Sequence, residues 1–107
     1  MKDRELLKLA AKAIGGSEVV WTDIDGNRYT GDPERPWNPL EDDGDALRLA
    51  VTLKMTVDVA LWSNEVQVRA YKDNFGMHHV NDEGDDHLAA TRRAIVRAAA
   101  EIGRVMP

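Results

Sequence analysis

The sequence has 107 residues, 43% of them hydrophobic and 31% charged, which is the size and composition of one globular domain spanning residues 1–107. It contains no cysteine, which excludes a disulfide framework, a thiolate zinc site, an iron–sulfur cluster and a cysteine nucleophile. A formal net charge of −5 disfavours nucleic acid as a partner. Small secreted domains usually carry disulfides, and no apolar run here is long enough to cross a membrane. We therefore expect a cytoplasmic protein with no membrane role.

The first part of the chain predicts one helix followed by a pair of strands. Apolar residues recur at helical spacing over 2–14, and Gly15-Gly16 is a typical helix end. β-Prone residues at 18–23 and 27–30 flank Asp25-Gly26, a dipeptide that is typical of a tight turn. We therefore expect an antiparallel hairpin after the first helix.

A proline-rich loop over 31–43 precedes a second helix, predicted at about 43–54. Asp42 or Asp43 is suited to cap its free N–H groups. This helix is apolar on almost all sides, so we expect it to be the most buried of the helices. Trp37, in the loop, has two interpretations: a lid folded onto the core, or an exposed anchor for a partner.

Two strands with alternating apolar and polar residues are predicted at 56–62 and 65–71. A two-residue turn at Ser63-Asn64 would place Asp58 opposite Arg69, a favourable cross-strand pair of charges. The rest of the chain predicts a loop over 72–84. A last helix follows at about 85–103, with Leu88 in its buried stripe.

The element order α-β-β-α-β-β-α predicts an α+β fold, with a four-stranded, mainly antiparallel sheet and three helices. Trp62 and Tyr71 lie on the mixed face of the second hairpin and leave two arrangements open. A helix covering them would give a three-layer α/β/α sandwich; without it they would belong to an exposed surface.

Histidines and acids near the start of the last helix suggest a metal site at first sight. Imidazole and carboxylate are suitable ligands, and His78, His79 and His87 lie close in sequence. Adjacent histidines point in different directions, however, and no His-Glu-x-x-His pattern occurs. We interpret the stretch as a polar loop whose acids cap the last helix, and we expect neither a metal nor a cofactor. A metal-assisted hydrolase is the alternative.

The last helix also contains several arginines, of which Arg93, Arg97 and Arg104 fall near one face. Such a stripe could bind phosphate on a nucleotide, a nucleic acid or an acidic protein. The alternative is a solvated face with an Arg97–Glu101 pair. No nucleophile elbow, dinucleotide fingerprint or phosphate-binding loop is present, so we expect a protein that is not an enzyme.

Two stretches resemble the small phage and prophage proteins grouped as the phage ABA-sandwich family. They are WNPLEDDGDALRLAV at 37–51 and ATRRAIVRAA at 90–99, and the likeness covers about residues 37–103. The resemblance implies an α/β/α sandwich and a phage gene product acting in a bacterial cytoplasm. It transfers no catalytic or binding residue.

These observations predict a non-enzymatic binding module, a phage accessory protein that recognises a host or phage protein. One alternative is a counter-defence protein that binds a host immune protein or sequesters a nucleotide signal. Another is a protein that binds nucleic acid through its last helix. A homodimer is also compatible with the sequence. The residues expected to form the binding surface are Trp37, Asn38, Asp43, Trp62, Arg69, Tyr71, Arg93 and Arg97.

Overall fold

The computed structural model describes part of the chain. The backbone is described at 2–14, 21–22, 28–29, 36–59, 65–71, 77–83 and 86–106, and side chains are described at 2–14, 37–59, 66–69 and 86–106. The predicted turns at Asp25-Gly26 and Ser63-Asn64, together with Trp62, lie outside the described residues.

The predicted helices are present as α1 (Asp3–Ala13), α2 (Asp43–Thr52) and α3 (His87–Val105). Of the two candidate caps of α2, Asp42 is the one used: its Oδ2 accepts from the N–H of Asp45 at 2.7 Å. Asp86 caps α3 in the same way, through the N–H of Ala89 at 3.1 Å. None of these described helices has the length and hydropathy that a membrane-spanning helix requires.

The described strands form two antiparallel sheets of three strands each, and a four-stranded sheet is not observed among them. The strands are β1 (Trp21–Thr22), β2 (Arg28–Tyr29), β3 (Pro36–Trp37), β4 (Thr56–Val59), β5 (Glu65–Tyr71) and β6 (Met77–Glu83). The expected pairing of the first hairpin is confirmed, with Trp21 opposite Tyr29.

The prediction of a loop over 72–84 is wrong, because β6 occupies Met77–Glu83 and pairs with β5 along its whole length. This segment lacks a clear alternation of apolar and polar residues. Its strand conformation is therefore explained by pairing with β5, a tertiary interaction that local propensity does not report. The expectation for β5 at 65–71 is confirmed, and the strand begins and ends at the predicted residues.

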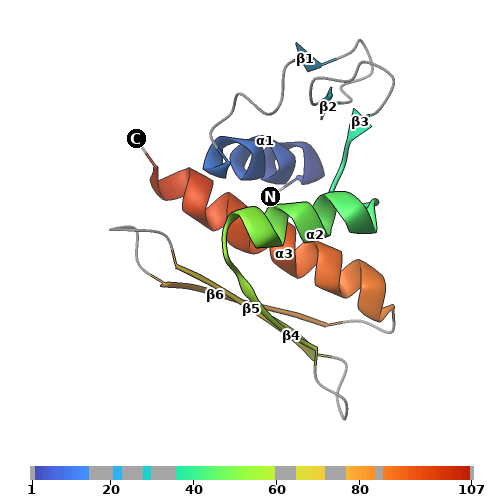
Figure 1. The fold of residues 1–107 in the computed structure, drawn as a ribbon, viewed down its shortest axis with the longest axis vertical. Coiled ribbons are helices and arrows are strands. Elements are labelled where there is room, and N and C mark those ends of the chain that lie inside the picture. Colours follow the sequence, from blue (N-terminus) through green and yellow to red (C-terminus); the bar gives the residue numbers. More distant parts are fainter. Residues whose placement is uncertain are drawn as a thin grey trace.

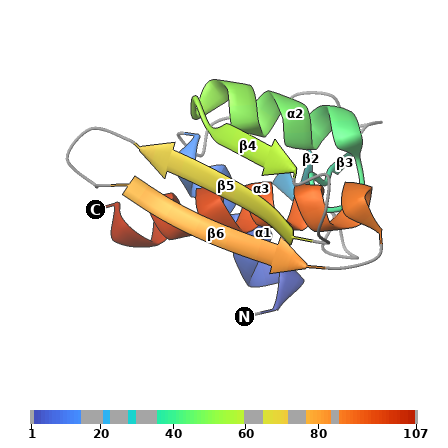
Figure 2. The ribbon, with the colours of Figure 1, turned by 90° about the horizontal axis from the view of Figure 1, so that it is seen from below.

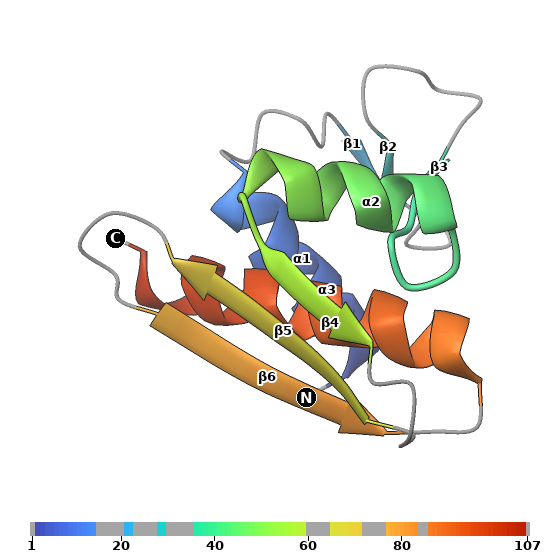
Figure 3. The ribbon, with the colours of Figure 1, turned by 60° about the horizontal axis from the view of Figure 1, so that its bottom comes forward.

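All three helices lie on the same side of the β4–β5–β6 sheet (Figures 1 and 3). α3 packs against all three strands of this sheet, while α1 and α2 pack against α3 (Figure 1). No described helix covers the opposite face, which is turned toward the viewer in Figure 2. The three-layer α/β/α sandwich is therefore not observed in the described part of the chain, where the fold is α+β.

The register of the second hairpin differs by two residues from the predicted one. Asp58 lies opposite Gln67, not opposite Arg69, whose partner is Thr56. A shift of two residues keeps every side chain on its own face, so the apolar pattern alone does not distinguish the two registers. The faces themselves are as expected, because Val66 and Val68 are both 0% exposed beneath the helices.

α1 and α3 approach each other closely because small side chains dominate their buried faces. The buried alanines are Ala10, Ala11 and Ala13 on α1, and Ala90, Ala94, Ala98, Ala99 and Ala100 on α3. At Gly103 the two helix backbones leave no room for a side chain, since a Cβ built there would lie 2.0 Å from the carbonyl oxygen of Leu9. Only glycine fits this position without moving one helix backbone.

Gly103→Ala should therefore lower the free energy of unfolding by about 3 kcal/mol or more, because the added methyl group meets backbone atoms that cannot rotate away. Gly44→Ala is the matched control, since the atoms nearest to its Cβ would be side-chain ends of Asp42 and Arg48, at 3.2 and 3.3 Å. Its effect should stay within about 1 kcal/mol. Urea denaturation of both variants measures the difference, and equal effects would contradict the close α1–α3 packing.

Candidate functional site

Trp37 belongs to the hydrophobic core. Its side chain is 7% exposed and lies in the core cluster with Leu49 and Ile102. This is the lid arrangement of the two that the sequence allows. Trp37 therefore offers no exposed ring to a partner in this structure.

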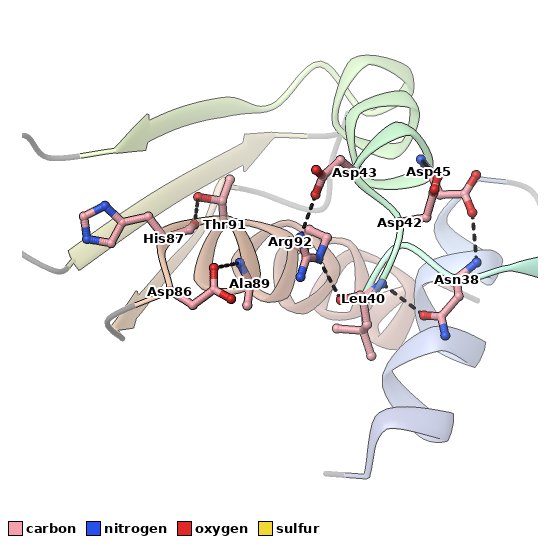
Figure 4. A network of polar contacts seen from close by, with 10 residues as sticks. All are labelled: Asn38, Leu40, Asp42, Asp43, Asp45, Asp86, His87, Ala89, Thr91 and Arg92. Carbon is pink, nitrogen blue, oxygen red and sulfur yellow. Dashed lines mark hydrogen bonds and ion pairs between the residues drawn. The ribbon is translucent and has the colours of Figure 1, made fainter.

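Asn38 shapes the loop before α2 and is held by the chain itself (Figure 4). Its N–H donates to Oδ2 of Asp45 at 3.0 Å, and its Oδ1 accepts from the N–H of Leu40 at 3.1 Å. Asp45 is only 5% exposed and also accepts from Nη2 of Arg48 at 2.7 Å. A buried carboxylate needs such donors, so these contacts have a structural explanation.

Arg92 links α3 to the start of α2 (Figure 4). Its Nε donates to the carbonyl oxygen of Leu40 at 2.9 Å, and its Nη1 donates to Oδ1 of Asp43 at 2.6 Å. The side chain of Arg92 is 18% exposed, whereas that of Asp43 is 64% exposed. We call these contacts the Arg92 clamp, and they fix the position of α2 on α3.

The predicted basic stripe on α3 is partly neutralised within the chain. Arg93 pairs with Asp3 on α1 at 3.3 Å. Arg104 pairs with Glu101 at 2.7 Å, and this hydrogen bond raises the pKa of Arg104 above its ordinary value. Arg97 is half-buried. The structure thus gives these arginines carboxylate or packing partners instead of one open cationic surface.

The remaining predicted residues do not come together in the described structure. Arg69 is half-buried on β5, opposite Thr56, and the side chain of Tyr71 lies outside the described residues. His78 and His79 lie on β6, again with side chains outside the described set, and His87 is exposed at the start of α3. No group of three potential metal ligands occurs among the side chains that are described.

An apolar groove of about 430 Å³ lies between α2, β4 and α3. We call it the α2–β4–α3 groove. Its apolar lining is Ala46, Leu47 and Ala50 from α2, Val57 and Val59 from β4, and Leu88 and Ile95 from α3. Thr91, His87 and the Asp43–Arg92 pair add its polar atoms. The volume falls within the ~300–1,000 Å³ that is usual for ligand sites.

Large apolar side chains around this groove are exposed to solvent. Leu47 on α2 is 64% exposed, and Leu88 on α3 is 63% exposed. Val51, one turn after Leu47 on α2, is 67% exposed. Two predictions are therefore wrong: α2 is not the most buried helix, since α3 buries nine of its 19 residues and α2 four of its ten, and Leu88 is not in the buried stripe of α3. The reason is that one face of α2, with Leu49, already packs in the core together with Leu53 just after the helix, and no described element covers its other apolar face.

A sequence signal for this groove did exist. A helix that is apolar on almost all sides needs neighbours on all sides, and a chain of 107 residues with three helices has few elements to provide them. The excess of apolar residues on α2 therefore indicated a second contact surface. Of the residues expected to form the binding surface, Asp43 is the one that lines the groove among those with described side chains.

Comparison with protein-family models found no match, and neither the curated proteins nor the solved structures gave a match. The resemblance to the phage ABA-sandwich family therefore stays a prediction based on two stretches of sequence.

Trp37→Ala should lower the free energy of unfolding by about 3–5 kcal/mol, because it removes a large buried ring from the core. Leu47→Ala is the control for truncation of a large apolar residue, and its effect should be within about 0.5 kcal/mol because Leu47 is 64% exposed. Chemical denaturation of both variants tests this. If the Trp37→Ala variant is as stable as the wild type, the core position of Trp37 is contradicted.

Arg92→Met should destabilise the fold by about 1–3 kcal/mol, because the carbonyl of Leu40 loses its donor in a partly buried position. Arg93→Met breaks an exposed ion pair on the same helix and should cost less than about 1 kcal/mol. Thermal and urea unfolding of the two variants compare them directly. If Arg93→Met costs as much as Arg92→Met, the Arg92 clamp has no special role.

Proposed function

We propose that this protein is a non-enzymatic binding module that holds an apolar segment of a protein partner in the α2–β4–α3 groove. The observation that supports this most directly is the exposure of Leu47 and Leu88 in the lining of one apolar groove, with exposed Val51 one turn from Leu47 on α2. Exposed apolar side chains that cluster together are typical of interaction sites, whereas single ones occur on any protein surface.

The energetics favour a partner that covers these side chains. Full burial of one leucine or valine is worth roughly 1.5–3 kcal/mol relative to leaving it in water. The two exposed leucines of the groove, with Val51 beside Leu47 on α2, therefore offer a substantial driving force for association. Because these side chains are exposed, they add little to the stability of the isolated chain. Their apolar character is therefore better explained by binding than by folding.

The polar residues of the groove favour binding over catalysis. Asp43 and Arg92 are paired with each other at 2.6 Å, so each has its charge satisfied by the scaffold. The other polar residues of the lining are His87 and Thr91, and the hydroxyl of Thr91 donates to the carbonyl oxygen of His87 at 2.6 Å. The sequence motifs of nucleophilic catalysis and phosphate binding are also lacking, as described above.

The resemblance to phage proteins supports a host or phage protein as the partner. Nucleic acid is the weaker alternative, because Arg92, Arg93 and Arg104 are paired with carboxylates of this chain. The net charge of −5 works in the same direction. A protein with an apolar segment therefore fits the described surface better than a phosphate-bearing ligand.

The double variant Leu47→Lys with Leu88→Lys tests the groove, because both side chains are exposed and the fold should remain intact. Glu5→Lys on α1 is the control: it makes the same change in net charge on an exposed position outside the groove lining. Each protein is immobilised and exposed to bacterial lysate. A protein captured by the wild type and by Glu5→Lys should be lost from the double variant.

The melting temperature and circular dichroism of the double variant should match those of the wild type. Equal capture by a folded double variant would contradict the proposed function, since binding would then not use the groove.

A further inference from the structure

We propose that the ligand of the α2–β4–α3 groove is an extended peptide that adds to β4 as a fourth strand, with alternating apolar and basic side chains. This inference rests on the proposed function and specifies its partner. The apolar side chains enter the groove, and a basic side chain lies beside Asp58 on the opposite face.

The first argument is the free edge of the sheet. β4 is the outermost strand of the order β4-β5-β6, and among the described residues β5 is the only strand paired with it. In an antiparallel pair every second residue directs its N–H and C=O away from the partner. The outer side of β4 therefore presents backbone groups that no described strand pairs. Such an edge is a template for another strand.

The second argument is the position of α2. This helix packs on α3 and lies on the β4 side of the helical layer, as Figures 2 and 3 both show. A strand added to β4 would lie about 4.8 Å farther out, on the side of the sheet where α2 lies. The side chains of Ala46, Leu47 and Ala50 line the groove from this helix. The space beside the edge is thus already lined with apolar groups.

The third argument is the alternation of side chains on β4. Val57 and Val59 lie opposite Val68 and Val66, which are 0% exposed toward the helices, so both face the groove. Asp58 between them faces the other side of the sheet. Residues directly opposite on an added strand share these faces. The strand therefore needs apolar residues opposite the two valines and a polar residue between them.

The charge of Asp58 selects the polar residue. Asp58 is exposed, its neighbour on β5 is the uncharged Gln67, and no ion pair to Asp58 is found among the described residues. A lysine or arginine opposite it would form a favourable cross-strand pair, and the net charge of −5 also attracts a basic peptide. By contrast, two copies of this chain paired symmetrically about Asp58 would bring two carboxylates together.

The test uses labelled synthetic heptapeptides that alternate lysine with valine, or glutamate with valine, with binding followed by fluorescence anisotropy. The lysine peptide should bind the wild type about tenfold more tightly than the glutamate peptide. Asp58→Lys should reverse this preference, whereas Glu5→Lys, with the same change in net charge, should retain it. Equal affinity of the two peptides for the wild type would overturn the proposal.

Amide hydrogen exchange followed by NMR gives the second readout. Saturation with the lysine peptide should slow exchange at two alternate residues of β4, because their outward N–H groups become hydrogen-bonded. Peptide binding that disappears in the Leu47→Lys, Leu88→Lys variant but leaves the β4 amides unchanged would overturn strand addition while leaving the proposed function intact. A wild-type dimer in sedimentation, with these amides already protected, would make a second copy the occupant and also overturn the proposal.

Discussion

The fold depends on how closely the other elements can approach α3. This helix contacts α1, α2 and the β4–β5–β6 sheet, so it provides the surface on which the other described layers are assembled. Its buried face is built mainly from alanine, and at Gly103 the backbone of α1 comes so near that no side chain fits. Close packing of this kind positions the helical layer firmly. α2 packs on α3 with one face, and its outer apolar face is covered by no described element.

The local elements could be predicted well from the sequence, because their causes are local. Asp42 caps α2 from the position directly before its first residue, and β5 has the alternating valines of a strand with one covered face. β6 could not be predicted in this way, since its strand conformation follows from pairing with β5. The register of Asp58 was also out of reach, because a shift of two residues preserves every face of the sheet.

The candidate site could be predicted only in part, for a related reason. Helical periodicity identifies which residues are apolar, but it does not tell which of them the remaining chain covers. Leu47 and Leu88 have the spacing of core residues and are nevertheless more than half exposed. Trp37 illustrates the converse, since a tryptophan in a proline-rich loop is compatible with either location and packs in the core here. Whether an apolar side chain is exposed depends on whether the chain has another helix or strand to cover its face.

The two ends of α2 determine how the groove responds to a ligand. At its first turn the Arg92 clamp holds α2 on α3. At its other end the helix leads within a few residues into β4. There Lys54 adopts the left-handed conformation at φ 54°, and the N–H of Met55 donates to the carbonyl oxygen of Ala50 at 2.9 Å. A helix held at both ends keeps the walls of the groove preorganised. The protein then loses little conformational entropy when it binds, and the ordering cost falls mainly on the flexible ligand. Ligands that are stiffened in advance should therefore gain the most in residence time.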